Sequence, residues 1–142
     1  MQMLTNTRKI RVQWGDCDPA GIVFYPRYFE WFDAGTILLF EKATGLTKIR
    51  MLEKYGGAGL ALLEARANFK VASHYGEDIE IETQVTEFRR SSFFVEHKVT
   101  KGAVLALEGF ETRLWTVRDR DDPMRLKSGT MPAEVIAAFQ QK

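Results

Sequence analysis

The sequence predicts an α+β fold in which a curved antiparallel sheet wraps around one long apolar helix. Three observations lead to this prediction: an aromatic helix pattern begins at Pro26, alternating strand patterns fill most of the chain after it, and tight turns join those strands. A length of 142 residues fits one domain, which we expect to span residues 1–142. The hydrophobic fraction of 45% is sufficient for a core.

Charge and cysteine content exclude several classes of protein. The 20 Lys and Arg residues nearly balance 19 Asp and Glu residues, which argues against a nucleic-acid partner. The single cysteine, Cys17, allows no intrachain disulfide, so we expect a reducing, cytoplasmic location. No apolar run reaches the roughly 18 residues of a membrane helix, and residues 1–9 lack a signal-peptide pattern. We therefore expect a soluble protein with no membrane partner.

The first strand and the loop after it precede the long helix. Residues Arg8 to Trp14 alternate charged and apolar side chains, which predicts a strand. The segment GDCDPAGIVFYP, residues 15–26, ends that strand because Gly, Asp and Pro favour turns. Two carboxylates and two glycines therefore lie directly before a helix.

The long helix is predicted over Pro26 to Thr44. Proline is well suited to the first helical position, and Gly45 is a typical C-cap. Aromatic and aliphatic side chains surround most of its circumference, so we expect burial on most sides. At about 1.5 Å per residue the helix is near 28 Å long.

The rest of the chain is mostly strand. Alternation of Ile79, Ile81 and Val85 with Glu80 and Glu82 predicts one sheet face on the helix and the other in solvent. The expected elements are a short helix at Lys48 to Lys54, strands at Leu60 to Ala72, Asp78 to Phe88, Phe93 to Thr100 and Val104 to Val117, and a terminal helix at Pro132 to Gln141. A curved sheet around one long helix is the hot-dog architecture.

The segment DCDPAGIVFYP, residues 16–26, resembles the active-site segment of the 4-hydroxybenzoyl-CoA thioesterase family, in the branch whose catalytic residue is an Asp before the long helix. The resemblance covers most of the chain. It implies a single hot-dog domain that hydrolyses an acyl-CoA thioester, such as 4-hydroxybenzoyl-CoA, to the free acid and CoA. It also implies a homotetramer, a dimer of dimers with active sites between subunits, no metal, and no cofactor beyond the CoA of the substrate.

The resemblance also implies site residues. Asp18 matches the catalytic aspartate, and the backbone N–H of Tyr25 matches the group that binds the thioester oxygen. The turn at Arg89, Arg90 and Ser91 resembles the family's turn that meets CoA phosphates.

Two further residues are candidate substrate contacts. Asp33 lies among aromatics on the long helix, at a position that in the family branch lies near the substrate ring. Gly21 would let the backbone approach the substrate closely. The segment GLTKI, residues 45–49, departs from 4-hydroxybenzoyl-specific members in a region that shapes the acyl pocket. Hydroxybenzoyl, benzoyl, naphthoyl and short aliphatic acyl groups therefore all stay open.

The chemistry needs an attacking oxygen and a donor to the carbonyl oxygen. Asp18 could attack directly or deprotonate a water, and free N–H groups at the helix start could stabilise the oxyanion, each by about 3 kcal/mol. In the alternative interpretations Asp18 only caps an Asp-Pro turn, or Asp16 is the acid. A Cys17 nucleophile lacks a nearby histidine in the sequence.

The remaining candidates have structural interpretations. His97 alternates with Val95 and Val99, which predicts a core position or a subunit contact, and His74 lies in a turn. Two histidines and one cysteine are too few for a typical zinc site. The tryptophans are expected in the core or an interface; they are Trp14, Trp31 and Trp115.

Three alternative functions fit the sequence less well than thioester hydrolysis. A hot-dog hydratase would need a histidine base near the helix, and residues 18–25 contain none. A non-catalytic acyl-CoA-binding module would not need the carboxylate of Asp18, and a purely structural oligomer would give the charged loop no purpose.

Overall fold

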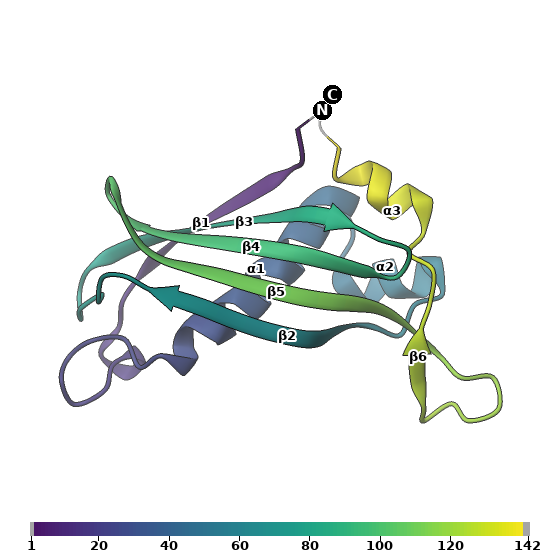
Figure 1. The fold of residues 1–142 in the computed structure, drawn as a ribbon, viewed down its shortest axis with the longest axis horizontal. Helices are drawn as coiled ribbons and strands as arrows, with labels where there is room; N and C mark the ends of the chain where they lie inside the picture. The colour runs from purple at the N-terminus through teal and green to yellow at the C-terminus, as the bar shows by residue number, and fades with distance from the viewer. Residues whose placement is uncertain (1, 141–142) are drawn as a thin grey trace.

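The computed structural model describes residues 2–140. An antiparallel sheet curves around one long helix, which confirms the predicted α+β arrangement (Figure 1). In chain order the elements are β1 (Thr5–Arg11), the 3₁₀ helix η1 (Trp14–Asp16), α1 (Pro26–Thr44), α2 (Lys48–Tyr55), β2 (Gly59–Phe69), β3 (Asp78–Phe88), β4 (Ser92–Lys101), β5 (Val104–Arg118), β6 (Leu126–Ser128) and α3 (Ala133–Ala138).

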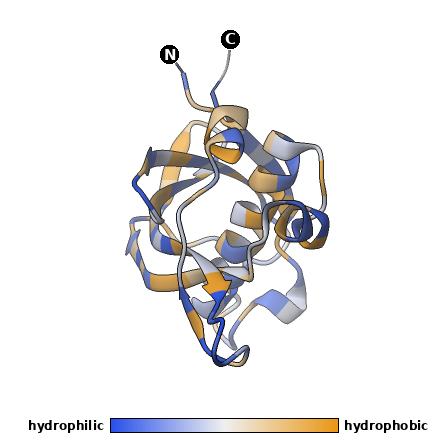
Figure 2. Cartoon of the chain, turned by 90° about the vertical axis from the view of Figure 1, so that its right-hand side faces the viewer, coloured by the Kyte–Doolittle hydropathy of each residue, from blue (hydrophilic) through white to orange (hydrophobic). Residues whose placement is uncertain are grey.

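The strands lie in the order β1-β3-β4-β5-β2, and β6 pairs with the end of β5. Every pairing is antiparallel, and the hairpins β3–β4 and β4–β5 form the centre of the sheet. Seen from the side, the sheet curves around α1 (Figure 2). The β3–β4 turn lies at one end of the sheet, beside α3, and the loop between β1 and α1 lies at the other (Figure 1).

Helix α1 has the predicted bounds. Pro26 is its first residue, and Gly45 ends it in the left-handed conformation with φ 72°. Its buried side chains pack into two apolar clusters. One surrounds Phe40 and includes Trp115 and Phe139, and the other surrounds Phe32. Each fully buried side chain of this size contributes about 1.5–3 kcal/mol, so these clusters fix α1 on the sheet.

Polar side chains are buried between the two clusters, under the middle of α1. They are Thr36, Thr83, His97, Glu111 and Arg113. The predicted core position of His97 is confirmed, since its side chain is fully buried and stacks on the ring of Phe32 with centroids 4.4 Å apart. The pairing of Glu111 with Arg113 inside the core was not predicted.

Several predicted bounds need correction. Strand β1 begins and ends three residues earlier than predicted, because the carboxylate of Asp16 accepts a hydrogen bond from the backbone N–H of Gln13 and starts η1 there. Trp14 consequently lies in η1 with 63% of its surface exposed, so a core position for it was wrong, whereas Trp115 is buried. Strand β6 was not predicted. Helix α3 is shorter than predicted, and Gln141 lies outside the described residues.

Across residues 2–140, no helix has the length and apolar character needed to cross a membrane.

Candidate active site

The loop between β1 and α1 folds back on itself around Asp18. The backbone N–H of Asp18 donates to the carbonyl of Ile22 (3.0 Å), and the N–H of Gly21 donates to the carbonyl of Asp18 (2.9 Å). Gly21 has φ 79°, a conformation that residues with a Cβ rarely adopt. The role of Gly21 in the structure is therefore to close this turn.

Asp18 lines a cleft of about 400 Å³. Its Oδ1 accepts a hydrogen bond from the N–H of Ala20 at 2.8 Å, and among residues 2–140 its Oδ2 has no hydrogen-bond partner. One oxygen therefore anchors the side chain of this cleft residue, and the other is left unpaired.

The first turn of α1 places a free backbone donor at the same cleft. The N–H groups of Phe24, Arg27 and Tyr28 donate to the carbonyls of Asp16, Phe24 and Tyr25 in turn. Pro26 has no N–H, and within the described residues the N–H of Tyr25 has no acceptor. Tyr25 lines the cleft beside Asp18. The positive end of the helix dipole adds to the attraction for a developing negative charge there.

The opposite wall of the cleft comes from residues 69–73, which include the last residue of β2 and the segment after it, together with Tyr28 of α1. Burial raises the pKa of the Tyr28 hydroxyl, which keeps it neutral. Lys101 anchors the wall by donating to the carbonyl of Ala72 at 2.8 Å. The sequence carried little signal for this wall, because the strand pattern only placed Phe69 and Val71 on one face, and both side chains are exposed in the structure.

Neither of the neighbours of Asp18 in the motif lines this cleft. The carboxylate of Asp16 accepts from Gln13 and lies 3.9 Å from the guanidinium of Arg27. The thiol of Cys17 lies 3.5 Å from the carbonyl of Gln13. Partial burial and the charges of Asp16 and Asp18 raise the pKa of this thiol, which disfavours a thiolate nucleophile.

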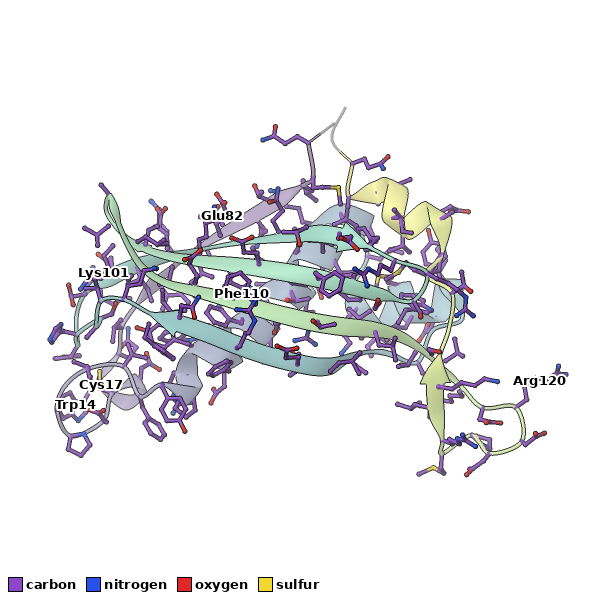
Figure 3. All side chains as sticks on the ribbon, viewed as in Figure 1. Trp14, Cys17, Glu82, Lys101, Phe110 and Arg120 are labelled. Carbon is purple, nitrogen blue, oxygen red and sulfur yellow. The ribbon has the colours of Figure 1, made fainter. Side chains whose placement is uncertain are left out.

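The other predicted contacts lie away from the cleft in a single copy of the chain. Asp33 is on α1 beyond Tyr25, where it pairs with Arg113. The turn at Arg89, Arg90 and Ser91 precedes β4, whereas Lys101, at the end of β4, contacts the cleft wall. The ten residues of β4 span about 30 Å. Figure 3 shows Lys101 at the same end of the sheet as Trp14 and Cys17.

The histidines do not line this cleft either. His74 is exposed and its Nδ1 lies 3.1 Å from a carboxylate oxygen of Glu77, whereas His97 is in the core. Among the described residues, no group of three or more His, Cys, Asp or Glu side chains is arranged to hold a metal ion. The groups at the cleft that can act chemically include the carboxylate of Asp18, the backbone N–H of Tyr25, the neutral Tyr28, and the side chains of Lys70 and Ser73.

The sequence and the fold of this chain are similar to those of known thioesterases. A family model described as the thioesterase-like superfamily matches residues 12–139. The 4-hydroxybenzoyl-CoA thioesterase of Pseudomonas sp. (strain CBS-3) is 35% identical over 136 residues, covering 92% of this chain and 94% of the relative. A solved structure of an Asp-to-Asn mutant of 4-hydroxybenzoyl CoA thioesterase, complexed with 4-hydroxybenzoyl CoA, has 31% identity and a TM-score of 0.85, covering 96% and 99% of the two chains. A gentisyl-coenzyme A thioesterase has 28% identity and a TM-score of 0.76, covering 94% and 98%.

Proposed function

This chain belongs to the thioesterase-like superfamily and is an acyl-CoA thioester hydrolase with the hot-dog fold, and we propose that its substrate is an aromatic acyl-CoA such as 4-hydroxybenzoyl-CoA. The observation that carries the proposed mechanism is that Asp18, which has one unpaired carboxylate oxygen, and Tyr25, whose backbone N–H is unpaired in the described part of the chain, line the same cleft. The hydroxylated aromatic acids in the names of two relatives support the choice of acyl group.

Asp18 either supplies the attacking oxygen or activates the water that attacks. In the nucleophilic route its Oδ2 attacks the thioester carbon, the C–S bond breaks, and CoA leaves as a thiolate that takes up a proton. Water then hydrolyses the resulting anhydride and restores the carboxylate. In the general-base route Asp18 removes a proton from a water that attacks the same carbon. Mass spectrometry of the acid-quenched enzyme distinguishes the routes, because only the first leaves the acyl mass on the peptide containing Asp18.

The N–H of Tyr25 stabilises the tetrahedral oxyanion in both routes. A preorganised backbone donor of this kind lowers the barrier by about 3–4 kcal/mol. It has no competing acceptor to release, since the described part of the chain leaves it unpaired. No metal and no cofactor besides the CoA of the substrate enters this mechanism.

The basic turn at Arg89, Arg90 and Ser91 is proposed to bind the CoA phosphates of a site on another copy. Both arginines are exposed, and the Nε of Arg89 is paired with Glu87 at 2.5 Å. The length of β4 separates this turn from the cleft of its own copy. A dimer of dimers, with each site formed between subunits, would place the turn near the cleft of a neighbour.

The test compares two Asp-Pro turns in this chain. Asp122 precedes Pro123 and accepts a hydrogen bond from the N–H of Met124 at 3.1 Å, just as Asp18 accepts from Ala20. Asn can accept the same bond, so Asp18→Asn and Asp122→Asn preserve both turns. We expect Asp18→Asn to lower kcat for CoA release by at least about 100-fold, and Asp122→Asn to leave it unchanged.

The assay uses 4-hydroxybenzoyl-CoA, benzoyl-CoA and a short aliphatic acyl-CoA. Preference for the aromatic thioesters supports the proposed substrate class, and preference for the aliphatic one contradicts it. Retention of wild-type turnover by Asp18→Asn on all three would show that Asp18 only caps its turn.

A further inference from the structure

The turn between β2 and β3, residues 70–77, is bound through its backbone to the loop before α1. The N–H of Val23 donates to the carbonyl of Ser73 at 2.9 Å, and the N–H of Tyr75 donates to the carbonyl of Gly21 at 3.0 Å. These bonds pair the turn with the stretch of the loop that lies between the carboxylate of the proposed mechanism and the start of α1. The β2–β3 turn therefore supports the part of the chain that joins the two reacting groups.

The same stretch of the loop, residues 21–23, also pairs with the segment that carries Asp18. The N–H of Asp18 donates to the carbonyl of Ile22 at 3.0 Å, and Cys17 forms an antiparallel bridge with Val23. Three short segments thus lie side by side, with residues 21–23 in the middle. The middle segment leads directly into the first turn of α1, so a displacement of the β2–β3 turn would change the distance between the carboxylate and the free N–H at the helix start.

Lys101, the last residue of β4, joins the start and the end of this turn at the end of the sheet that carries Cys17 (Figure 3). Its Nζ donates to the carbonyl of Ala72 at 2.8 Å and to Oε1 of Glu77 at 3.1 Å. The same Oε1 accepts from the N–H of His74 at 2.6 Å. The hydrogen bonds from His74 and Lys101 lower the pKa of the Glu77 carboxyl, so it is ionised near neutral pH. We call Lys101 and Glu77 the clamp.

The clamp supports the middle of the turn, whereas backbone bonds fix the two ends. The N–H groups of residues 70 and 71 donate to the carbonyl of Ala106 in β5, and the N–H of Gly76 donates to the carbonyl of Val12. Within the described part of the chain, the clamp supplies the only side-chain hydrogen bonds to the backbone of residues 72–75. Loss of the clamp would therefore loosen the part of the turn that pairs with the loop before α1.

We propose that Lys101 is a positioning residue for thioester hydrolysis, which holds the β2–β3 turn so that the loop before α1 keeps Asp18 and the N–H of Tyr25 at their working distance. Lys101 acts through the turn rather than on the substrate. This inference rests on the proposed function, because it concerns the same cleft. A displacement of about 1 Å at a reacting group can slow a reaction by about 100-fold, so a remote clamp of this kind has a measurable effect on kcat.

The experiment measures kcat and KM of Lys101→Met and Lys101→Arg with 4-hydroxybenzoyl-CoA and benzoyl-CoA. Methionine keeps the apolar stem and loses the ammonium group, so we expect kcat to fall about tenfold or more on both substrates, with a smaller change in KM. Arginine has enough N–H donors for both Ala72 and Glu77, so Lys101→Arg should recover most of the lost kcat. Circular dichroism checks that each variant is folded at the temperature of the assay.

Two additional variants keep the test decisive. The matched control is Lys42→Met, because the Nζ of Lys42 also donates to a backbone carbonyl, that of Thr5, at 2.7 Å, and neither residue lines the cleft. It should leave kcat unchanged. Glu77→Ala removes the acceptor that Lys101 and His74 share, so it should lower kcat even if Lys101→Met does not fold. The variant with both clamp substitutions should lose less than the product of the two single losses, because the two residues act as one unit.

The outcomes separate this inference from the proposed function. Absence of wild-type hydrolysis of both aryl-CoAs would overturn the proposed substrate class. Wild-type hydrolysis of both with an unchanged kcat in folded Lys101→Met would overturn the inference alone, and if that variant is unfolded, an unchanged kcat in Glu77→Ala has the same meaning. An equal loss of kcat in Lys42→Met, or a loss in Lys101→Met that appears only in KM, would also remove the positioning role of Lys101.

Discussion

At the scale of single residues, the loop before α1 divides two carboxylates between two tasks. Asp16 is bound to the backbone of Gln13 and closes η1, whereas Asp18 keeps one oxygen free at the cleft. The turn at Asp122 has the same local chemistry as that at Asp18, yet it lies in an exposed loop. What distinguishes Asp18 is therefore the helix start and the apolar wall around it, rather than its own turn.

Glu111 gives a prediction about acid stability. Burial raises the pKa of its carboxyl, but the hydrogen bonds from His97 and Arg113 outweigh burial and lower the pKa from 4.5 to about 2. A lowered pKa stabilises the fold above pH 4.5, and this contribution is lost as the pH falls toward 2. The shift corresponds to about 3 kcal/mol. We expect the free energy of unfolding, measured with urea at pH 2 to 7, to fall by about this amount across that interval.

The comparison for this prediction is Glu111→Gln, which cannot ionise. Its free energy of unfolding should be lower at pH 7 and should change less between pH 4.5 and 2. Asp78→Asn is the surface control, because Asp78 is paired but exposed. Its substitution should have little effect on the acid slope, which is the change in the free energy of unfolding between pH 4.5 and 2. An acid slope in Glu111→Gln equal to that of the parent would show that another carboxylate governs this interval.

At the scale of elements, the sequence predicted the helices and strands whose ends are marked by local residue signals. Pro26 and Gly45 mark both ends of α1, and its bounds were correct. Strand β6 has only three residues and owes its form to pairing with β5, so it offered no periodicity to detect. In β5, alternation separates Phe110 from Glu111, but it does not reveal that the charged face is the buried one.

The same limits apply to the candidate site. Asp18 and Tyr25 belong to one contiguous motif, so their proximity could be expected from sequence, and the structure places both at one cleft. Residues 69–73 reach the cleft from a distant strand, and no local pattern links them to the motif. The pairing of Asp33 with Arg113 likewise depends on how α1 lies across β5, which propensities do not encode.

Close packing between α1 and β5 gives a prediction at the element scale. A Cβ on Gly109 of β5 would come within 2.3 Å of the ring of Phe32, whereas one on Gly15 would meet nothing within 4 Å. Because Phe32 is buried and cannot withdraw, Gly109→Ala should lower the free energy of unfolding by about 1–3 kcal/mol. Gly15→Ala should change it little. Equal stability of the two variants in urea unfolding would mean that α1 can shift relative to the sheet.

At the scale of the whole molecule, the two ends of the sheet carry different parts of the proposed site. The cleft lies at the end that includes the loop before α1, and the turn between β3 and β4 lies at the other (Figure 1). Strands β1 and β2 have open edges in a single copy. Exposed Leu62 and Leu63 on β2 add apolar surface there. Such an edge favours association with another strand.

A site shared between copies predicts that two inactive variants restore each other. Asp18→Ala lacks the attacking carboxylate, and the double variant Arg89→Ala, Arg90→Ala lacks the phosphate-binding turn. In a mixed oligomer, Asp18 of one copy meets the intact turn of the other, so one complete site forms. We expect co-refolded mixtures to recover CoA release with a maximum near equal amounts, whereas mixtures of Asp18→Ala with Asp18→Asn recover none. Sedimentation should confirm that the mixtures are oligomeric. If their activity is then no greater than the sum of the separate variants, the turn and the cleft of each site lie on one copy. The CoA arm would in that case have to run the length of β4.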